Sequence, residues 1–134
     1  MPGDLPENRT ATADLEVTPA HTAAAAGSGD LQVLATPAMA ALMEQAACRV
    51  VQPLLSADRT TVGTALAIRH FRPTPVGARV TASATLIRRD GAHLTFHVSA
   101  RDGGGEIGAG THERVMIRTA EFLERLAAGR GGAA

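Results

Sequence analysis

An acid and an imidazole stand in stretches of the chain that are otherwise apolar. Glu44 lies within the segment AALMEQAACRVV, and the residues on its side of a helix are Ala, Met and Val. A carboxylate there is costly unless it is paired, hydrogen-bonded or facing a cleft. His70 closes an apolar stretch directly before a proline-containing turn. If the two meet in one cleft, the imidazole can serve as general base, and the carboxylate can either orient the imidazole or act as nucleophile.

Each candidate also has a purely structural explanation. Glu44 could lie at a rim or bind a neighbouring chain, and His70 could be a hydrogen-bonded structural residue. Thr36 precedes Pro37 and suits the N-cap of a helix. A helix start also carries free N–H groups and positive potential, which would stabilise an oxyanion. Thr36 and Glu44 are about 80° apart on a helical wheel, so both could border one groove.

The elements that must position these residues are one helix and several strands. A helix is predicted from Pro37 to about Gln52, with a narrow polar stripe of Gln45, Arg49 and Gln52 and the rest of its circumference buried. Residues 20–30 are small and flexible, typical of a connector or a minimal lid. We expect strands at 14–18, 60–71, 79–89, 93–101 and 106–118, and a short helix at 120–128. Runs of strands around one buried helix indicate an α+β fold.

Alternation within the strands predicts which side chains face the helix. One set of apolar positions in the second and third long strands is Val80, Ala82, Ala84, Leu86, Leu94, Phe96, Val98 and Ala100. Asp90-Gly91 predicts a hairpin between these two strands. In the strand before them, Val62, Thr64, Leu66 and Ile68 are in phase with His70, which is therefore expected on the apolar face.

Composition limits the kinds of partner. The chain has 134 residues, 13 basic and 13 acidic, which suits one domain with no net field to attract nucleic acid or an anionic membrane. Its one cysteine, Cys48, excludes a disulfide within the chain, and we expect a reduced, cytoplasmic protein. We expect a loose tail at residues 1–13, the domain at 14–122 and a helix end with a flexible tail at 123–134.

Other residues carry weaker signals. Gly63 suits a bulge or a point of close packing. His112 and Glu113 should point to opposite faces of a strand, so these two would not form a metal pair. His21, His93, His97 and His112 lack the spacing of zinc ligands, and no phosphate-binding or nucleophile-elbow motif is present. No metal site is predicted.

Several segments together resemble the fluoroacetyl-CoA thioesterase family. They are TPAMAALMEQAACRVVQ (36–52), VGTA (62–65), His70 and EIGAGTHER (106–114), within a similarity that covers about residues 14–122. The resemblance implies a hot-dog fold, in which a curled antiparallel sheet wraps one central helix, and homodimers with active sites at the subunit interface. It implies catalytic roles for Thr36, Glu44 and His70. Gly63 would contact the acyl group or water, and Arg114 would line the site. The resemblance implies no metal or redox cofactor. CoA enters the reaction as part of the substrate.

One departure from the family concerns selectivity. The selective enzyme has a longer segment before its catalytic threonine, with phenylalanines that cover the fluoroacetyl group, whereas AAAAGSGD (23–30) has no aromatic residue. The resemblance therefore supports hydrolysis of a small or short-chain acyl-CoA more than it supports fluoroacetyl selectivity. The alternatives are a non-catalytic acyl-CoA or small-ligand binding protein of the same fold, a hot-dog enoyl-thioester hydratase, and a structural protein.

Overall fold

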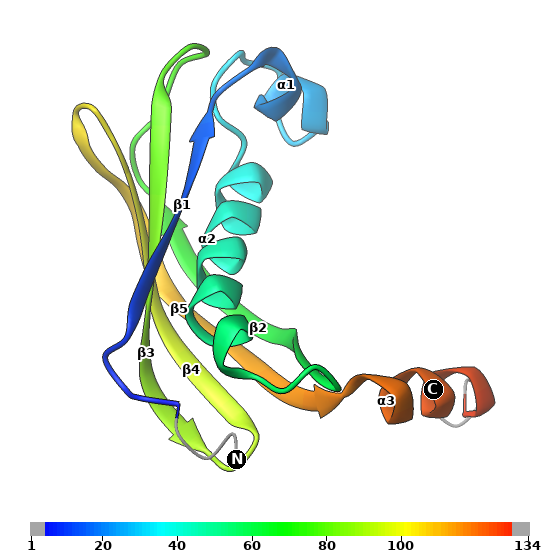
Figure 1. Ribbon diagram of the computed structural model, residues 1–134. Helices are drawn as coiled ribbons and strands as arrows, with labels where there is room; N and C mark the ends of the chain where they lie inside the picture. Colours follow the sequence, from blue (N-terminus) through cyan, green and yellow to red (C-terminus); the bar gives the residue numbers. More distant parts are fainter. Residues whose placement is uncertain (1–4, 130–134) are drawn as a thin grey trace.

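One long helix lies in the concave face of a curved antiparallel sheet (Figure 1). The computed structural model describes residues 5–129. Its strands follow the order β1-β3-β4-β5-β2 across the sheet. The elements are β1 (Thr10–Glu16), α1 (Ala23–Ala26), α2 (Thr36–Val51), β2 (Arg59–His70), β3 (Arg79–Asp90), β4 (His93–Asp102), β5 (Gly105–Arg118) and α3 (Thr119–Ala128), with short 3-10 turns at Pro19–His21 and Gln52–Leu54. The predicted α+β hot-dog arrangement is confirmed.

The core is the contact between α2 and the inner face of the sheet. All eight apolar positions predicted from alternation in β3 and β4 are buried, and so are seven residues of α2. Gln45 and Arg49 on α2 and Gln52 at its C-cap are exposed, as predicted, and Arg49 Nη1 donates to the Thr12 carbonyl at 3.0 Å. The Asp90-Gly91 hairpin is also present, with Gly91 at a φ of 64° that favours glycine. None of the helices in residues 5–129 is long and apolar enough to cross a membrane.

Two boundaries differ from the sequence predictions. β1 begins at Thr10 and pairs with β3 from Thr85 onward, so residues 10–13 belong to the sheet and not to a loose tail. Their alternation of Thr and Ala is too weakly hydrophobic to stand out as a strand. Ala35 is the N-cap of α2, and Thr36 is its first helical residue, so the hydroxyl of Thr36 does not cap the helix. The predicted N-cap role of Thr36 is therefore wrong. Residues 1–4 and 130–134, at the ends of the predicted tails, lie outside the described residues.

A bulge in β2 changes the predicted phase of that strand. Gly63 pairs with Arg114 and Ala65 pairs with Glu113, so Thr64 is the extra residue. Val62 pairs with Val115 and faces away from the helix, contrary to the uninterrupted alternation that the sequence predicts. After the bulge, Leu66 pairs with the buried His112, and His70 keeps its predicted place on the inner face. The bulge lets Gly63 and Leu66, three residues apart, face the same side.

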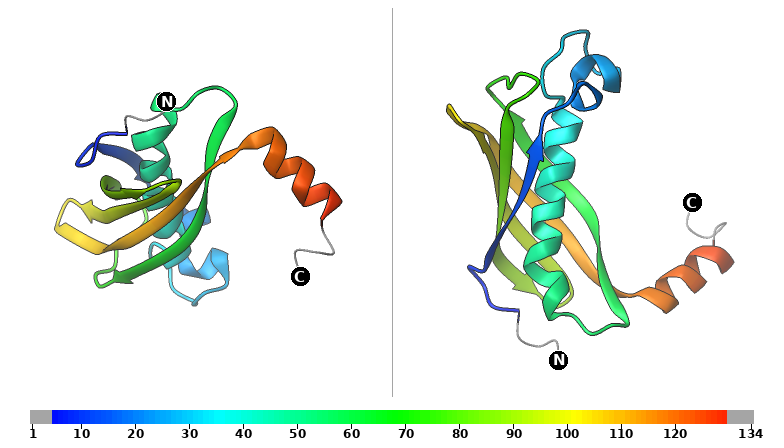
Figure 2. Two further views of the ribbon diagram at one scale, coloured as in Figure 1. Left: turned by 90° about the horizontal axis from the view of Figure 1, so that it is seen from below. Right: turned by 45° about the horizontal axis from the view of Figure 1, so that its top comes forward.

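β2 is an edge strand with an uncharged stretch at its centre, between Arg59 and Arg69. The run Gly63-Thr64-Ala65-Leu66-Ala67 is exposed at every position. Figure 2 shows β2 at the opposite side of the sheet from β1, with α3 projecting from the end of β5. The α3 helix has no buried residue, and Phe122, Leu123 and Leu126 are exposed apolar side chains on it. These surfaces are available to another molecule.

Candidate active site

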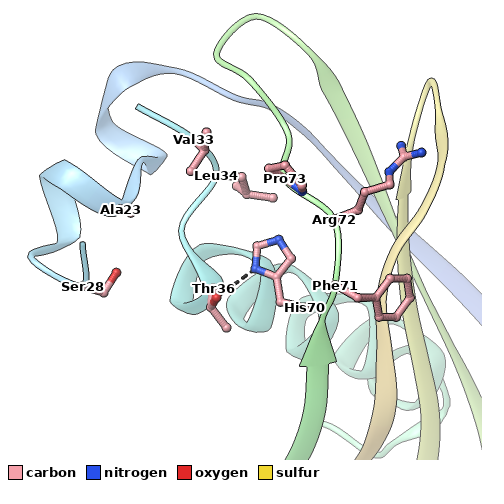
Figure 3. Close-up of a pocket in the computed structure, with 9 residues that line it drawn as sticks. All are labelled: Ala23, Ser28, Val33, Leu34, Thr36, His70, Phe71, Arg72 and Pro73. Atoms are coloured by element: carbon pink, nitrogen blue, oxygen red, sulfur yellow. Dashed lines mark hydrogen bonds between the residues drawn. The ribbon is translucent and has the colours of Figure 1, made fainter. Parts of the chain in front are cut away.

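Thr36 and His70 meet where α2 begins and β2 ends. The Thr36 hydroxyl lies 2.8 Å from Nδ1 of His70 (Figure 3). The helix runs antiparallel to the strand, so the start of one element meets the end of the other. The hydroxyl that could have capped the helix instead fixes the orientation of the imidazole. Two of the three predicted catalytic residues are thus in direct contact.

A pocket of about 510 Å³ surrounds this pair. One wall comes from the segment before α2, and the other comes from the end of β2 and the residues that follow it (Figure 3). The lining residues are Ala23, Ser28, Val33, Leu34, Thr36, His70, Phe71, Arg72 and Pro73. The predicted minimal lid, residues 20–30, therefore does border the pocket, and it contributes only small side chains. Phe71 is the one aromatic residue in the lining, and its ring points away from His70.

The second ring nitrogen of His70 is the unusual feature of the pocket. Nε2 is buried and has no hydrogen-bond partner among the described residues. Burial lowers the pKa of His70 below its ordinary value of 6.5, and the neighbouring Arg72 backbone opposes this only in part. The imidazole is therefore neutral at pH 7. When Nδ1–H donates to the Thr36 hydroxyl, Nε2 carries a lone pair and can accept a proton.

Glu44 lies in a second cluster farther along α2. Its Oε2 is 3.7 Å from Nε2 of His112, and its side chain is 43% exposed. His112 is 1% exposed, and its Nε2 lies 3.0 Å from Nη1 of Arg114. Arg114 is also buried, and its Nε and Nη2 donate to the hydroxyl and carbonyl of Thr61 at 2.8 and 3.1 Å. Glu44 has no hydrogen bond from the described residues, so its carboxylate is free to act on a ligand.

Gly63 lies between the charged members of this second cluster. A Cβ atom at this position would lie 3.0 Å from Oε2 of Glu44, 3.2 Å from Nη1 of Arg114 and 3.3 Å from Cε1 of His112. The absence of a side chain therefore lets the carboxylate and the guanidinium approach the same part of the β2 backbone. The predicted residues Glu44, Gly63 and Arg114 converge in this second cluster.

The two clusters are separate within one subunit. Thr36 and Glu44 are eight residues apart on α2, which corresponds to about 12 Å along the helix axis. Among the described residues, no contact joins Glu44 to His70. Within one subunit, the imidazole of His70 is therefore oriented by Thr36 and not by Glu44.

A salt bridge braces the pocket wall beyond β2. Arg72 pairs with Asp102, which also accepts hydrogen bonds from the Thr74 hydroxyl and the Gly104 N–H at 2.8 Å each. Burial raises the pKa of Asp102, but the hydrogen bonds and the charge of Arg72 outweigh this effect and lower it below 3.8. This ionised carboxylate ties the segment after β2 to the β4–β5 turn.

Sequence reasoning missed His112 and Thr61 as members of the site. His112 was considered only as a metal ligand. The predicted opposite orientation of His112 and Glu113 is confirmed, since His112 is buried and Glu113 is exposed. The sequence did indicate this possibility, because His112, Arg114 and Met116 occupy alternate positions and so share one face of the strand, and two of these three side chains are polar. Which side chains they meet depends on the β2–β5 register. No group of three His, Cys, Asp or Glu side chains in residues 5–129 is placed to hold a metal ion.

Comparison with solved structures defines the class of protein. A thioesterase-superfamily protein from Thermus thermophilus is 28% identical, with a TM-score of 0.85 and 98% of each chain covered. A variant of fluoroacetyl-CoA thioesterase in complex with acetyl-CoA is 33% identical, with a TM-score of 0.86 over 92% of this chain and 97% of that one. The fold is that of the hot-dog thioesterase superfamily.

Sequence comparison identifies the family within that superfamily. The model of the fluoroacetyl-CoA-specific thioesterase family matches residues 17–120. The fluoroacetyl-CoA thioesterase of Streptantibioticus cattleyicolor is 43% identical over 91 residues, which are 68% of this chain and 66% of that relative. The chain belongs to the fluoroacetyl-CoA-specific thioesterase family.

Proposed function

We propose that the protein hydrolyses a small or short-chain acyl-CoA to the free acid and CoA. The observation that carries this proposal is the Thr36–His70 pair, which leaves a buried, unpartnered imidazole nitrogen in a pocket at a helix start. Family membership supports the same chemistry, since the named relative is a thioesterase. The segment of residues 20–30 contributes only Ala23 and Ser28 to the lining, and the Phe71 ring is directed away from His70, so no aromatic side chain covers a fluoroacetyl group.

In the proposed reaction, His70 acts first as general base and then as acid. Nε2 takes a proton from water as the water oxygen attacks the thioester carbonyl, and the C–S bond then breaks. The protonated imidazole returns that proton to the CoA thiolate. The positive end of α2 near Thr36 stabilises the oxyanion. Glu44 either orients the attacking water or attacks the carbonyl itself to form an anhydride that water then opens. These steps need no metal or redox cofactor.

We further propose a homodimer that joins the two clusters across the edge strands. The exposed run from Gly63 to Ala67 has no charge or proline and is suited to strand pairing, because edge strands that stay unpaired usually carry charges or prolines. Two copies of β2 related by a two-fold axis run antiparallel. An axis at Ala67 would set His70 opposite the Gly63–Thr64 bulge of the partner subunit, close to Glu44 of the partner subunit. Arg114 and Gly63 would then line the completed site.

The test of the proposed function is thiol release from a panel of acetyl-, propionyl-, butyryl- and fluoroacetyl-CoA. We expect turnover of the short acyl-CoAs and a loss of roughly a hundredfold or more in kcat for His70→Ala and Glu44→Gln. Near wild-type rates in both folded variants would reject the catalytic assignment. CoA-dependent thermal stabilisation without thiol release would favour the non-catalytic binding protein instead. Because a disulfide within the chain is impossible, we propose that the protein acts in the cytoplasm.

A further inference from the structure

His112 is the only side chain within ion-pair distance of Glu44 in the part of the chain that the structure describes. It is 1% exposed and lies on β5 opposite Leu66, with Cε1 3.3 Å from where a Cβ atom on Gly63 would be. Its Nδ1 lies 2.8 Å from the carbonyl oxygen of Ala65, the residue after the β2 bulge. Its Nε2 lies 3.0 Å from Nη1 of Arg114 and 3.7 Å from Oε2 of Glu44. His112 therefore connects the bulge, the guanidinium and the carboxylate.

These partners determine the protonation state of His112. A carbonyl oxygen can only accept, so Nδ1 must carry the hydrogen and donate it to Ala65. A guanidinium can only donate, so Nε2 must present its lone pair to Arg114. The imidazole is thus neutral and held as its Nδ1–H tautomer. Burial also lowers the pKa of His112; the bond to Ala65 and the charge of Glu44 oppose this, whereas the charge of Arg114 adds to it.

The fixed tautomer in turn fixes Arg114. All three nitrogens of the guanidinium are engaged, two by Thr61 and one by His112. Arg114 is 8% exposed, and no carboxylate of the described residues lies within salt-bridge distance of it. Its charge is consequently held next to the Cα of Gly63, on the same side of the β2 backbone as the Glu44 carboxylate.

We propose that His112 is a positioning residue that places the Arg114 guanidinium beside Glu44 and holds the β2 bulge at Gly63. Since both ring nitrogens are already engaged, His112 does not exchange protons with the substrate. It acts through Arg114 and through the backbone that Glu44 faces. This role rests on the proposed thioesterase function, because the position of Arg114 beside Glu44 affects turnover only if Glu44 takes part in catalysis.

Two substitutions separate the two hydrogen bonds of His112. In His112→Asn, the side-chain amide can still donate to the Ala65 carbonyl, but the acceptor for Arg114 is lost. In His112→Gln, the longer side chain can place an amide oxygen near the former Nε2 and accept from Arg114, but the donor to Ala65 is lost. His112→Ala removes both. The variants therefore form a matched set around one buried position.

We expect kcat for a short acyl-CoA to fall roughly tenfold or more in His112→Ala and His112→Asn, with KM within about twofold of wild type. His112→Gln should recover most of kcat although its melting temperature falls about as much as that of His112→Asn. A purely structural residue would instead make activity follow melting temperature in all three variants. That result, or wild-type kcat in His112→Ala, would overturn the proposal.

The tautomer can be checked without any activity measurement. In 15N-histidine NMR spectra, the His112 signals, assigned by their loss in His112→Gln, should show a protonated Nδ1, and the pKa of the ring should lie below that of a free imidazole. An Nε2–H tautomer, or titration like that of a free imidazole, would refute the geometry on which the proposal depends. If the wild-type protein hydrolyses no acyl-CoA, the proposed function fails and the catalytic part of this role fails with it, while the spectra still decide the fixed tautomer.

Discussion

Two histidines lie against α2, and their hydrogen bonds give them different chemistry. His70 has one nitrogen held by Thr36 and one buried nitrogen without a partner. His112 has both nitrogens engaged, by Ala65 and Arg114. A base must keep a lone pair available to the substrate, so the role falls to His70. His112, the imidazole nearer to Glu44, is thus the one that does not transfer protons.

Replacement of Gly63 by alanine tests how closely the second cluster surrounds the β2 backbone. The new methyl group would lie 3.0 Å from the Glu44 carboxylate and 3.2 Å from the buried Arg114 guanidinium, so at least one of them must move. We expect kcat for a short acyl-CoA to fall roughly tenfold or more, because a small misplacement of a catalytic group is costly. The matched control is Gly103→Ala, whose Cβ would meet nothing within 4 Å. Equal activity of the two variants would contradict the proposed place of Gly63.

The two neutral histidines predict how stability depends on pH. The pKa values of His70 and His112 are lowered from 6.5 by burial, so the unfolded chain binds more protons than the folded chain as the pH falls below about 6.5. The contribution of the two neutral histidines to the free energy of unfolding is complete above that pH and is lost as the pH falls below it. We expect the melting temperature to fall by a few degrees between pH 7.5 and 5.5, and the slope to be smaller in His112→Gln. The Asp102 contribution stays intact in this window, because its pKa lies below 3.8.

At the scale of elements, alternation and turn chemistry were enough to predict most of the strands and the long helix, while the hot-dog arrangement was predicted from the family resemblance. The apolar positions of β3 and β4 and the Asp90-Gly91 turn correctly indicated a hairpin packed on the helix. The bulge at Thr64 could not be predicted, because strict alternation continues through it in the sequence. The cluster of Glu44 with His112 could not be predicted either, since it depends on the register between β2 and β5 and on how α2 crosses them. The resemblance predicted catalytic roles for Thr36, Glu44 and His70, but it did not predict their hydrogen-bond and ion-pair partners.

The α3 helix is predicted to be dispensable for folding of the subunit. It has no buried residue, and its first residue, Thr119, is tied to the body through the Asp58 carbonyl at 3.0 Å. Removal of residues 120–134 retains that bond, so we expect the melting temperature to change by no more than roughly 3 °C. Circular dichroism melts of the truncated and complete chains provide the measurement. A larger decrease would mean that Leu123 and Leu126 are covered by another molecule in the native protein.

At the scale of the whole molecule, the proposed dimer predicts that two inactive variants restore activity together. If Glu44 and His70 of one site come from different subunits, a mixed dimer of Glu44→Gln and His70→Ala has one site with both residues intact. Random mixing makes half of the dimers mixed, so roughly a quarter of wild-type activity should return. Thiol release after co-refolding of the two variants is the measurement. Activity that stays at the level of the separate variants would show that both residues act within one subunit.

The uncharged edge of β2 also has a consequence for handling the protein. An exposed, uncharged run in an edge strand can pair with other strands, so a separated subunit would be prone to self-association through Gly63–Ala67. Dimerisation would protect that edge, and folding would be linked to association by mass action. The melting temperature should therefore rise as the protein concentration rises, and highly dilute samples should lose activity and adsorb to surfaces. Thermal melts across a hundredfold range of concentration would detect this, and a constant melting temperature would mean that the subunit is stable alone.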